Sequence, residues 1–311
     1  MLRRMLLAAS ASDRIRGMVV AAPPTAGVVA RYVAGDDTAA AVSAATRLRA
    51  RGLLVTLDYL GEDTTDADQA AAVAAEYVAL LARLRADGLA RGGAVEVSVK
   101  PTAIGLHLPE HGEKTAAANL ARICAAARDA GTTVTADMED HTHAEATLRL
   151  VRELRDDFPD LGCVIQSQLR RSLADCAELA GPRSRVRLCK GAYQAPEQLA
   201  FTTRAEVDRS FARCLPVLMS GRGYPMIATH DPRLIRITAA QAELTGRGHS
   251  GFEYQMLYGV RPAEQERLAG TGAQVRVYLP YGRDWYGYLV RRLAERPANL
   301  AFFLRSLASR S

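Results

Sequence analysis

Lysine, cysteine and long apolar runs are scarce in this sequence. Among its 40 basic residues, only Lys100, Lys114 and Lys190 are lysines, which suggests that these positions need a compact ammonium group. No run approaches the roughly 20 apolar residues that a membrane-spanning helix needs, and Arg3 and Arg4 interrupt the apolar N-terminus. We therefore expect a cytoplasmic protein without a transmembrane helix or a signal peptide.

The cysteines and the charge balance argue against further classes of protein. The five cysteines lie far apart and include no C-x-x-C pair, so neither a zinc site nor a disulfide framework is indicated. The net charge of +6 is modest, and the basic residues are interspersed with Asp and Glu, which argues against a nucleic-acid partner. With 49% hydrophobic and 24% charged residues, the chain has an ordinary globular composition.

Short aliphatic runs alternate with longer stretches of helical period from Leu53 onward, which is typical of repeated βα units. Eight such units favour a distorted (β/α)8 TIM-type barrel over an open doubly wound sheet. The predicted strands are Leu53–Leu60, Val95–Lys100, Thr133–Asp137, Cys163–Gln166, Val186–Lys190, Met226–Thr229, Gly251–Met256 and Val275–Leu279. The predicted helices are Asp66–Ala86, Lys114–Ala130, His143–Asp156, Leu169–Ala180, Arg204–Ser220, Pro232–Leu244, Pro262–Ala269 and Trp285–Arg296. Residues 1–51 are expected to form an N-terminal helical extension, and residues 52–311 a barrel domain with a C-terminal helix from Pro297.

Polar and ionisable residues gather at the predicted strand ends. In barrels of this kind the active site lies at the carboxyl ends of the strands. Residues on the strands or just after them include Asp58, Glu62, Lys100, Asp137, Glu139, Gln166, Arg187, Lys190, Thr229, His230, Asp231, Glu253, Gln255 and Tyr278. Any one of them alone reads as a capping or solvated loop residue. So many ionisable groups together would be costly to desolvate unless they are paired or meet a charged ligand.

The last predicted barrel helix carries a second polar cluster. Tyr288, Arg291, Arg292 and Glu295 are spaced three or four residues apart and therefore share one helix face. Two guanidinium groups present planar forks that match a small carboxylate, so this face is a candidate carboxylate clamp. The alternative is a solvated ion pair of about 0.5 kcal/mol or less.

Two motifs point to other functions. The glycines of Gly246–Gly251 spell G-x-G-x-x-G, but the motif precedes a predicted strand, whereas a dinucleotide-binding loop follows one. The H-x-H pair of His141 and His143, with Asp140 and His230, is typical of a metal-dependent barrel hydrolase, although its place after the third strand favours a helix start. A barrel that binds a ligand without catalysis is a third hypothesis.

Seven segments, in order along nearly the whole chain, resemble the proline dehydrogenase family. They are Thr56–Glu62, Val97–Lys100, Thr135–Glu139, Arg187–Tyr193, Ala228–Asp231, Phe252–Leu257 and Tyr288–Glu295. The resemblance is to the short monofunctional form, which lacks the aldehyde dehydrogenase half of fused relatives. It implies an FAD enzyme that oxidises L-proline to Δ1-pyrroline-5-carboxylate, the first step of proline catabolism to glutamate. Hydride would pass from proline C5 to flavin N5.

The resemblance also implies partners. Electrons would pass to a membrane quinone, so we expect peripheral contact with the inner face of the cell membrane. A separate pyrroline-5-carboxylate dehydrogenase would oxidise the product. The cofactor would be FAD, and no metal is expected.

The resemblance implies a role for each matching position. Lys100, Arg291 and Arg292 would hold the proline carboxylate, Tyr278 and Asp137 would line the pocket, Leu257 and Tyr288 would pack on the ring, and Glu295 would support the arginines. Met138, Gln166, Arg187, Lys190, Gly191, Ala192, Thr229, His230 and Glu253 would contact FAD, and Glu62 would pair with Lys100 or gate the site. Arg187, permanently cationic, would stabilise the negative charge that develops on the flavin. The base for the amine proton is left open between Asp137 and a bound water.

Overall fold

Eight parallel strands close a barrel in the computed structural model, which describes residues 25–62 and 64–295. The strands are β1 Leu54–Tyr59, β2 Val95–Val99, β3 Val134–Ala136, β4 Gly162–Gln166, β5 Arg185–Cys189, β6 Tyr224–Ala228, β7 Glu253–Leu257 and β8 Val275–Tyr281. Each strand pairs with the next along the chain, and β8 pairs with β1, so the predicted (β/α)8 barrel is confirmed.

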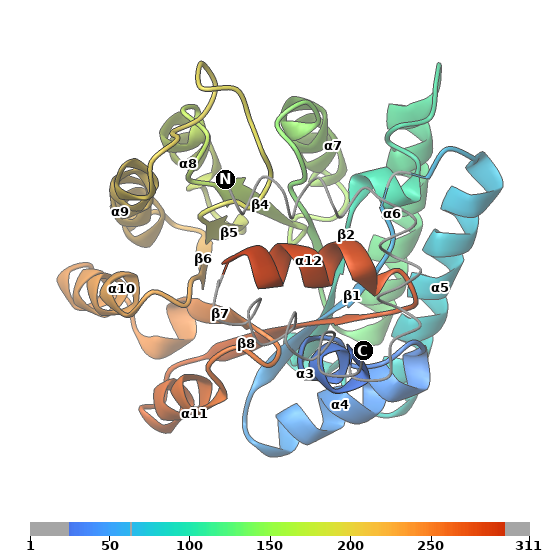
Figure 1. Cartoon of the computed structure of the whole chain (residues 1–311), viewed down its shortest axis with the longest axis horizontal. Helices are drawn as coiled ribbons and strands as arrows, with labels where there is room; N and C mark the ends of the chain where they lie inside the picture. The colour runs from blue at the N-terminus through green and yellow to red at the C-terminus, as the bar shows by residue number, and fades with distance from the viewer. Residues whose placement is uncertain (1–24, 63, 296–311) are drawn as a thin grey trace, which may run out of the picture.

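Helices surround the barrel and follow the strands in the expected alternation (Figure 1). They are α3 Thr25–Tyr32, α4 Thr38–Ala50, α5 Ala67–Ala86, α6 Gly112–Ala130, α7 Ala144–Leu154, α8 Ser172–Leu179, α9 Arg204–Ser220, α10 Pro232–Leu244, α11 Pro262–Gly270 and α12 Trp285–Glu295. Short 3-10 turns are η1 Arg91–Gly93, η2 Pro101–Ile104 and η3 His249–Gly251. Helices α3 and α4 fall in the predicted N-terminal extension, whereas residues 1–24 and the predicted helix from Pro297 lie outside the described residues.

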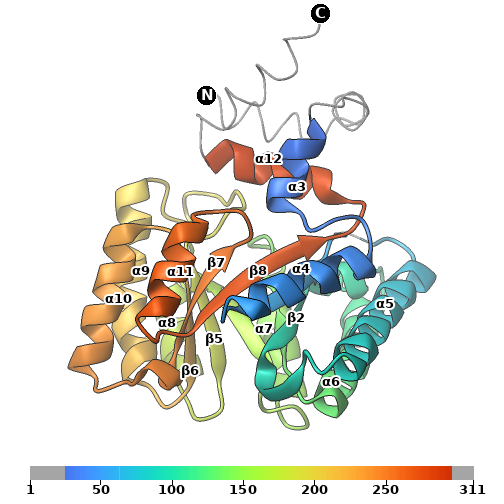
Figure 2. The same cartoon turned by 90° about the horizontal axis from the view of Figure 1, so that it is seen from below.

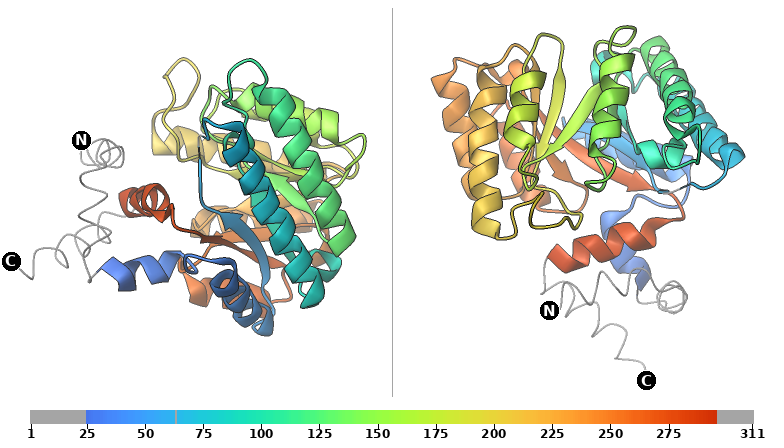
Figure 3. Two further views of the ribbon diagram at one scale, coloured as in Figure 1. Left: turned by 90° about the vertical axis from the view of Figure 1, so that its right-hand side faces the viewer. Right: turned by 90° about the horizontal axis from the view of Figure 1, so that it is seen from above.

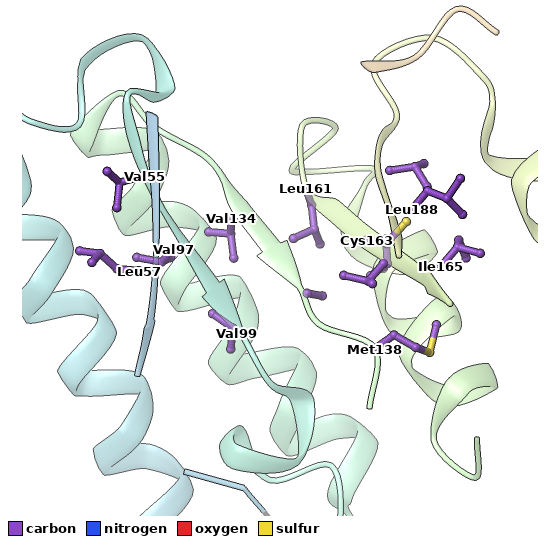
Figure 4. Close-up of a cluster of buried hydrophobic side chains, with 14 of the residues drawn as sticks. Val55, Leu57, Val97, Val99, Val134, Met138, Leu161, Cys163, Ile165 and Leu188 are labelled. Atoms are coloured by element: carbon purple, nitrogen blue, oxygen red, sulfur yellow. The ribbon is translucent and has the colours of Figure 1, made fainter. Parts of the chain in front are cut away.

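The main hydrophobic core lies between the barrel and its helices. Strand β2 alternates in sequence, and its Val95, Val97 and Val99 belong to the apolar cluster outside the barrel. Figure 4 shows Val97 and Val99 with Val55, Leu57 and their neighbours in this cluster. Burying each such side chain stabilises the fold by roughly 1.5–3 kcal/mol relative to leaving it exposed.

The barrel interior, by contrast, holds a buried ion cluster. Arg185 Nη2 donates to Glu96 Oε2 at 2.6 Å, and Arg276 Nε donates to Glu253 Oε1 at 2.8 Å. Burial acts to raise the pKa of Glu96, but Arg185, Arg276 and Arg187 lower it to about 2. The cluster therefore stays ionised in the middle of the fold, where many barrels of this class carry branched apolar residues.

Helix α12 crosses the carboxyl end of the barrel and packs beside α3 (Figures 1, 2 and 3). A second apolar cluster holds it there. Tyr286, Tyr288, Leu289 and Val290 of α12 pack with Tyr32, Val33 and Leu60. Leu60 directly follows β1, so this packing fixes α12 over the strand ends.

Candidate active site

Lys100 and Asp58 form a buried ion pair at the mouth of the barrel. Lys100 follows β2, Asp58 lies on β1, and Lys100 Nζ donates to Asp58 Oδ1 at 2.6 Å. The two residues are 5% and 0% exposed. Burial acts to lower the pKa of Lys100, but Asp58, Asp137 and Glu62 together raise it above its ordinary value. Lys100 is therefore a fixed cation, and Asp58 Oδ2 has no hydrogen-bond partner within the described part of the chain.

Arg187 stands at the centre of a second network. Its Nε donates to Gln255 Oε1 at 2.6 Å, and its Nη1 donates to Ser98 Oγ at 3.0 Å and to Asp137 Oδ1 at 2.5 Å. The Tyr278 hydroxyl donates to Asp137 Oδ2 at 2.7 Å, and the Arg187 guanidinium carbon lies 5.2 Å from the Tyr278 ring centroid. Partners from separate strands thereby fix the plane of one guanidinium group through Nε and Nη1, while Nη2 is buried without a hydrogen-bond partner among the described residues.

Helix α12 brings Arg292 toward the same end of the barrel. The Arg292 guanidinium carbon lies 5.3 Å from the ring centroid of Tyr288. Burial raises the pKa of the Cys189 thiol, at the end of β5, to about 11, while Arg187 and Arg292 act against this rise. Arg292 is thus close enough to the end of β5 to act on a side chain there. The side chains of Arg291 and Glu295 lie outside the described residues.

Several predicted flavin contacts lie together at the ends of β3, β4 and β5. Gln166 Nε2 donates to the backbone oxygens of Met138 and Glu139 at 3.0 and 2.6 Å, which orients this buried amide. Gly191 has a φ of +99°, and a Cβ there would lie 2.7 Å from Gln166 Oε1 and 2.5 Å from Gln168 Cδ. Only glycine therefore fits at this position without displacing the two glutamines.

Other predicted contacts have partners of their own. Lys190 Nζ lies 2.5 Å from Asp208 Oδ1 and 3.1 Å from Asp231 Oδ2, so two carboxylates hold it. His230 Nε2 accepts a hydrogen bond from the Leu257 backbone N–H at 2.9 Å, which links the ends of β6 and β7. Thr229 Oγ1 accepts from the Asp231 backbone N–H at 3.2 Å, and Ala192 directly follows Gly191 in the loop after β5. Lys190, His230 and Leu257 therefore all lie at the carboxyl ends of their strands.

Glu253 has other surroundings than expected, and Glu62 does not form the direct bond to Lys100 that is one of its two expected roles. Glu253 is the first residue of β7 and is fully buried with Arg276 in the ion cluster, so it is not brought to the mouth. The predicted start of this strand at Gly251 is wrong, because His249–Gly251 forms the η3 turn and strand pairing begins at Glu253. Glu62 Oε1 accepts from the Tyr193 hydroxyl at 3.4 Å, while the bonded partner of Lys100 is Asp58.

The residues of the metal hypothesis serve other roles. Asp140 Oδ1 accepts from the Thr142 backbone N–H at 2.8 Å and lies 3.0 Å from His143 Nδ1, in the turn that precedes α7. The His230 nitrogen that accepts from Leu257 is unavailable to a metal. In residues 25–62 and 64–295, no three His, Cys, Asp or Glu side chains are grouped to hold a metal ion. The structure therefore gives this hypothesis no support.

Four residues of the site belong to no role expected from the sequence. Ser98, Gln255 and Asp58 hold the two cations, and Glu96 Oε1 lies 4.0 Å from Arg187 Nη2. Their signal in the sequence is alternation with period two, since Glu96 and Ser98 stand between the valines of β2. Polar residues at that period on a strand buried on both faces indicate a polar barrel interior.

Glu139 gives the protein a pH-dependent stability. Burial raises the pKa of Glu139 to about 7, although Thr102 donates to both carboxyl oxygens. The folded state therefore keeps a proton that the unfolded state releases above about pH 4.5, so stability falls as the pH rises from 4.5 to 7. Between pH 5 and pH 8 we expect the free energy of unfolding of the parent protein to fall by about 3 kcal/mol because of Glu139. Glu139→Gln should lack this fall, as urea unfolding at the two pH values measures.

The control for this prediction is Glu153→Gln, which changes an exposed glutamate of α7. This variant should follow the parent protein within about 0.5 kcal/mol at both pH values. Equal pH slopes for the parent and Glu139→Gln would contradict the assignment.

Comparison with known proteins gives one family. A family model described as proline dehydrogenase matches residues 41–305. The chain is 38% identical over 280 residues to Proline dehydrogenase 1 of Bacillus subtilis subsp. natto, and 38% identical over 279 residues to a proline dehydrogenase of Deinococcus radiodurans, with 89% of each chain covered in both cases.

Solved structures agree with this match. Proline utilization A (PutA) from Bdellovibrio bacteriovorus, inactivated by N-propargylglycine, aligns with a TM-score of 0.80 and 25% identity over 96% of this chain and 34% of that one. PutA from Corynebacterium freiburgense, at 21% identity and a TM-score of 0.75, shares the fold over 99% of this chain and 34% of its own. The chain thus spans about a third of the length of these larger proteins. The barrel fold agrees with the sequence matches, and the chain belongs to the proline dehydrogenase family.

Proposed function

We propose that this protein is an FAD-dependent proline dehydrogenase that oxidises L-proline to Δ1-pyrroline-5-carboxylate, the first step of proline catabolism. The observation that carries the proposal is the pair of fixed cations, Lys100 and Arg187, at the end of the barrel that α12 covers. The family is flavin-dependent, and its curated members that resemble this chain are named proline dehydrogenases.

The cations suit a substrate that carries one carboxylate. Lys100 keeps its proton because Asp58 and Asp137 lie beside it, and Arg292 approaches from α12. In this proposal Lys100, Arg291 and Arg292 bind the proline carboxylate, with Glu295 supporting the arginines. Tyr278, Tyr288 and Leu257 enclose the ring. A water-poor site strengthens each of these charge interactions.

The Arg187 network is suited to a reaction in which negative charge develops beside it. Asp137 receives hydrogen bonds from Ser98, Arg187 and Tyr278, which holds its carboxylate in place. Asp137 thereby positions Arg187 and Tyr278, and because Arg187 is fixed before the reaction, its charge is available without reorganisation. Groups that an enzyme holds in the reactive orientation contribute much of its rate acceleration.

The ends of β3 to β6 fit a bound flavin. The oriented amide of Gln166 and the backbone of Gly191, which Gln166 and Gln168 approach closely, form a polar surface beside Met138 and Ala192. We propose that these residues, with Lys190, Thr229 and His230, would hold FAD, which would supply the two-electron acceptor for oxidation at proline C5. Glu62, beside Tyr193 at the entrance, is proposed to gate the site.

Two partners complete the proposal. A membrane quinone receives the two electrons, through peripheral contact at the inner face of the cell membrane, and a separate pyrroline-5-carboxylate dehydrogenase consumes the product. None of the helices in the described residues is both long and apolar enough to cross a bilayer.

An anaerobic titration tests the function. The purified protein, supplied with FAD, should show a visible flavin band that L-proline bleaches and D-proline leaves unchanged. A protein that takes up no flavin, or a bound flavin that L-proline does not reduce, would refute the proposal.

A further inference from the structure

A cavity of about 770 Å³ lies at the amino-terminal end of the barrel, opposite the proposed active site. Its walls come from residues that precede or begin the strands, such as Gly93 before β2, Thr133 before β3 and Gln274 before β8. This volume is within the range of small-molecule sites. None of the residues given a role in proline oxidation lines it.

Arginine dominates the charged lining of this cavity. Arg183, Arg185, Arg222, Arg247 and Arg276 line it, and Asp160 is the one acidic residue among the lining side chains. These arginines come from β5, β8 and the loops before β5, β6 and β7. Cations from several separate segments converging on one cavity raise the local concentration of anions.

Three of the five charges are already balanced. Arg183 Nη2 lies 3.1 Å from Asp160 Oδ2, Arg185 pairs with Glu96, and Arg276 pairs with Glu253. Two positive charges, those of Arg222 and Arg247, therefore remain for the cavity as a whole.

Arg247 has no carboxylate partner among the described residues. Its guanidinium instead donates to the backbone oxygens of Met219, Gly221, Gly223 and Gly251. Burial lowers the pKa of Arg247, so its charge is held at a cost in free energy that a bound anion would reduce.

Arg185 has an unused donor beside the cavity. The residue is 9% exposed, and its Nη1 has no hydrogen-bond partner in the described part of the chain, although Nη2 is bonded to Glu96. A buried guanidinium nitrogen without an acceptor destabilises the fold. Nη1 itself is shielded from solvent, so a ligand oxygen would remove this destabilisation only once the side chain turns toward the cavity.

We propose that this cavity binds a phosphoryl dianion, either inorganic phosphate or the phosphate group of a small metabolite. The two uncompensated charges match a dianion, and arginine forks match the oxygens of a phosphoryl group. The exposed Arg222 and the half-buried Arg247 are the uncompensated cations that would contact the ligand, with the guanidinium of Arg185 beside them in the lining.

Isothermal titration calorimetry of the flavin-loaded protein tests this site. Inorganic phosphate and AMP are titrated at pH 8 against chloride at matched ionic strength, so that bound flavin occupies its own site. Saturable binding of at least one of them is expected. Tighter binding of phosphate would identify the free ion as the ligand, and tighter binding of AMP would identify a phosphorylated metabolite. Either result supports the proposal, and no saturable binding of either overturns it.

Two exposed variants with opposite expected signs locate the binding. Arg222→Gln should weaken it about tenfold by removing one charge-assisted contact, and Asp160→Asn should tighten it about threefold by freeing Arg183. Arg236→Gln, at an exposed arginine of α10, is the matched control and should leave the affinity unchanged. Binding that Arg222→Gln does not weaken, or that Arg236→Gln weakens equally, would place the anion elsewhere and overturn the proposal.

Discussion

Arg187→Lys is expected to lower kcat for proline oxidation by about 100-fold or more while flavin remains bound. The variant keeps the positive charge but loses the planar fork. Arg187 uses two nitrogens to reach Gln255 on β7, Ser98 on β2 and Asp137 after β3 at the same time. A single ammonium group cannot hold these directions together, so the charge would no longer stand where we propose that negative charge develops.

Stopped-flow reduction of the bound flavin under anaerobic conditions measures this effect directly. The expected change is in the limiting rate of reduction at saturating proline. Arg155→Lys is the matched control, because Arg155 also forms several hydrogen bonds, to Leu161, Ser184 and Arg185, but lies outside the barrel mouth. If Arg187→Lys reduced the flavin as fast as this control, Arg187 would have no part in the chemistry.

The fold could be predicted because its local signals agree with the barrel. Helix α9 begins at Arg204 as predicted, since Thr203 and Glu206 form a capping box at its start. Helix α10 begins at Pro232 for a similar reason, with Asp231 capping it and proline in the first turn. These signals are read within a few residues of sequence and need no knowledge of distant contacts.

The pairing of charges could not be predicted in the same way. Asp58 and Glu62 both stand near the end of β1, and the family resemblance implies Glu62, not Asp58, as the partner of Lys100 or as a gate. The closed barrel decides this, because β1 and β2 pair with Asp58 beside Ser98, two residues before Lys100. Glu62 lies in the loop beyond the strand, where it meets Tyr193.

The position of Glu253 depends on a turn of three residues. A strand from Gly251 would have placed Glu253 two residues along its length, but the η3 turn makes it the first residue of β7. Period-two alternation places Glu253, like Glu96 and Arg276, inside the barrel. The depth of each residue along the barrel follows only from strand register.

Lys100→Met is expected to destabilise the fold by about 3–5 kcal/mol and to raise KM for proline more than 100-fold. Lys100 is the cation bonded to Asp58, whose side chain is 1% exposed, and removing it leaves a buried carboxylate without its partner. Because the neighbouring carboxylates raise the pKa of Lys100, this contribution is present up to its ordinary pKa near 10.4 and is lost only as the pH rises through the folded value. Burial raises the pKa of Asp58 and Lys100 acts against this rise, so without Lys100 the folded state keeps a proton that the unfolded state releases. The loss of stability should therefore be larger at pH 9 than at pH 6.

The double variant Asp58→Asn/Lys100→Met separates the two effects. Neutralising Asp58 removes the unpaired charge, so urea unfolding should show most of the stability restored. KM should stay high, because the cation that we propose binds the proline carboxylate is still missing. Asp58→Asn alone should cost less stability than Lys100→Met, since an ammonium group on a flexible stem can reach water more easily than a buried carboxylate on β1. If the double variant were no more stable than Lys100→Met, the Asp58 charge would not be the source of the loss. Recovery of a normal KM in the double variant would instead show that Lys100 serves only to neutralise Asp58.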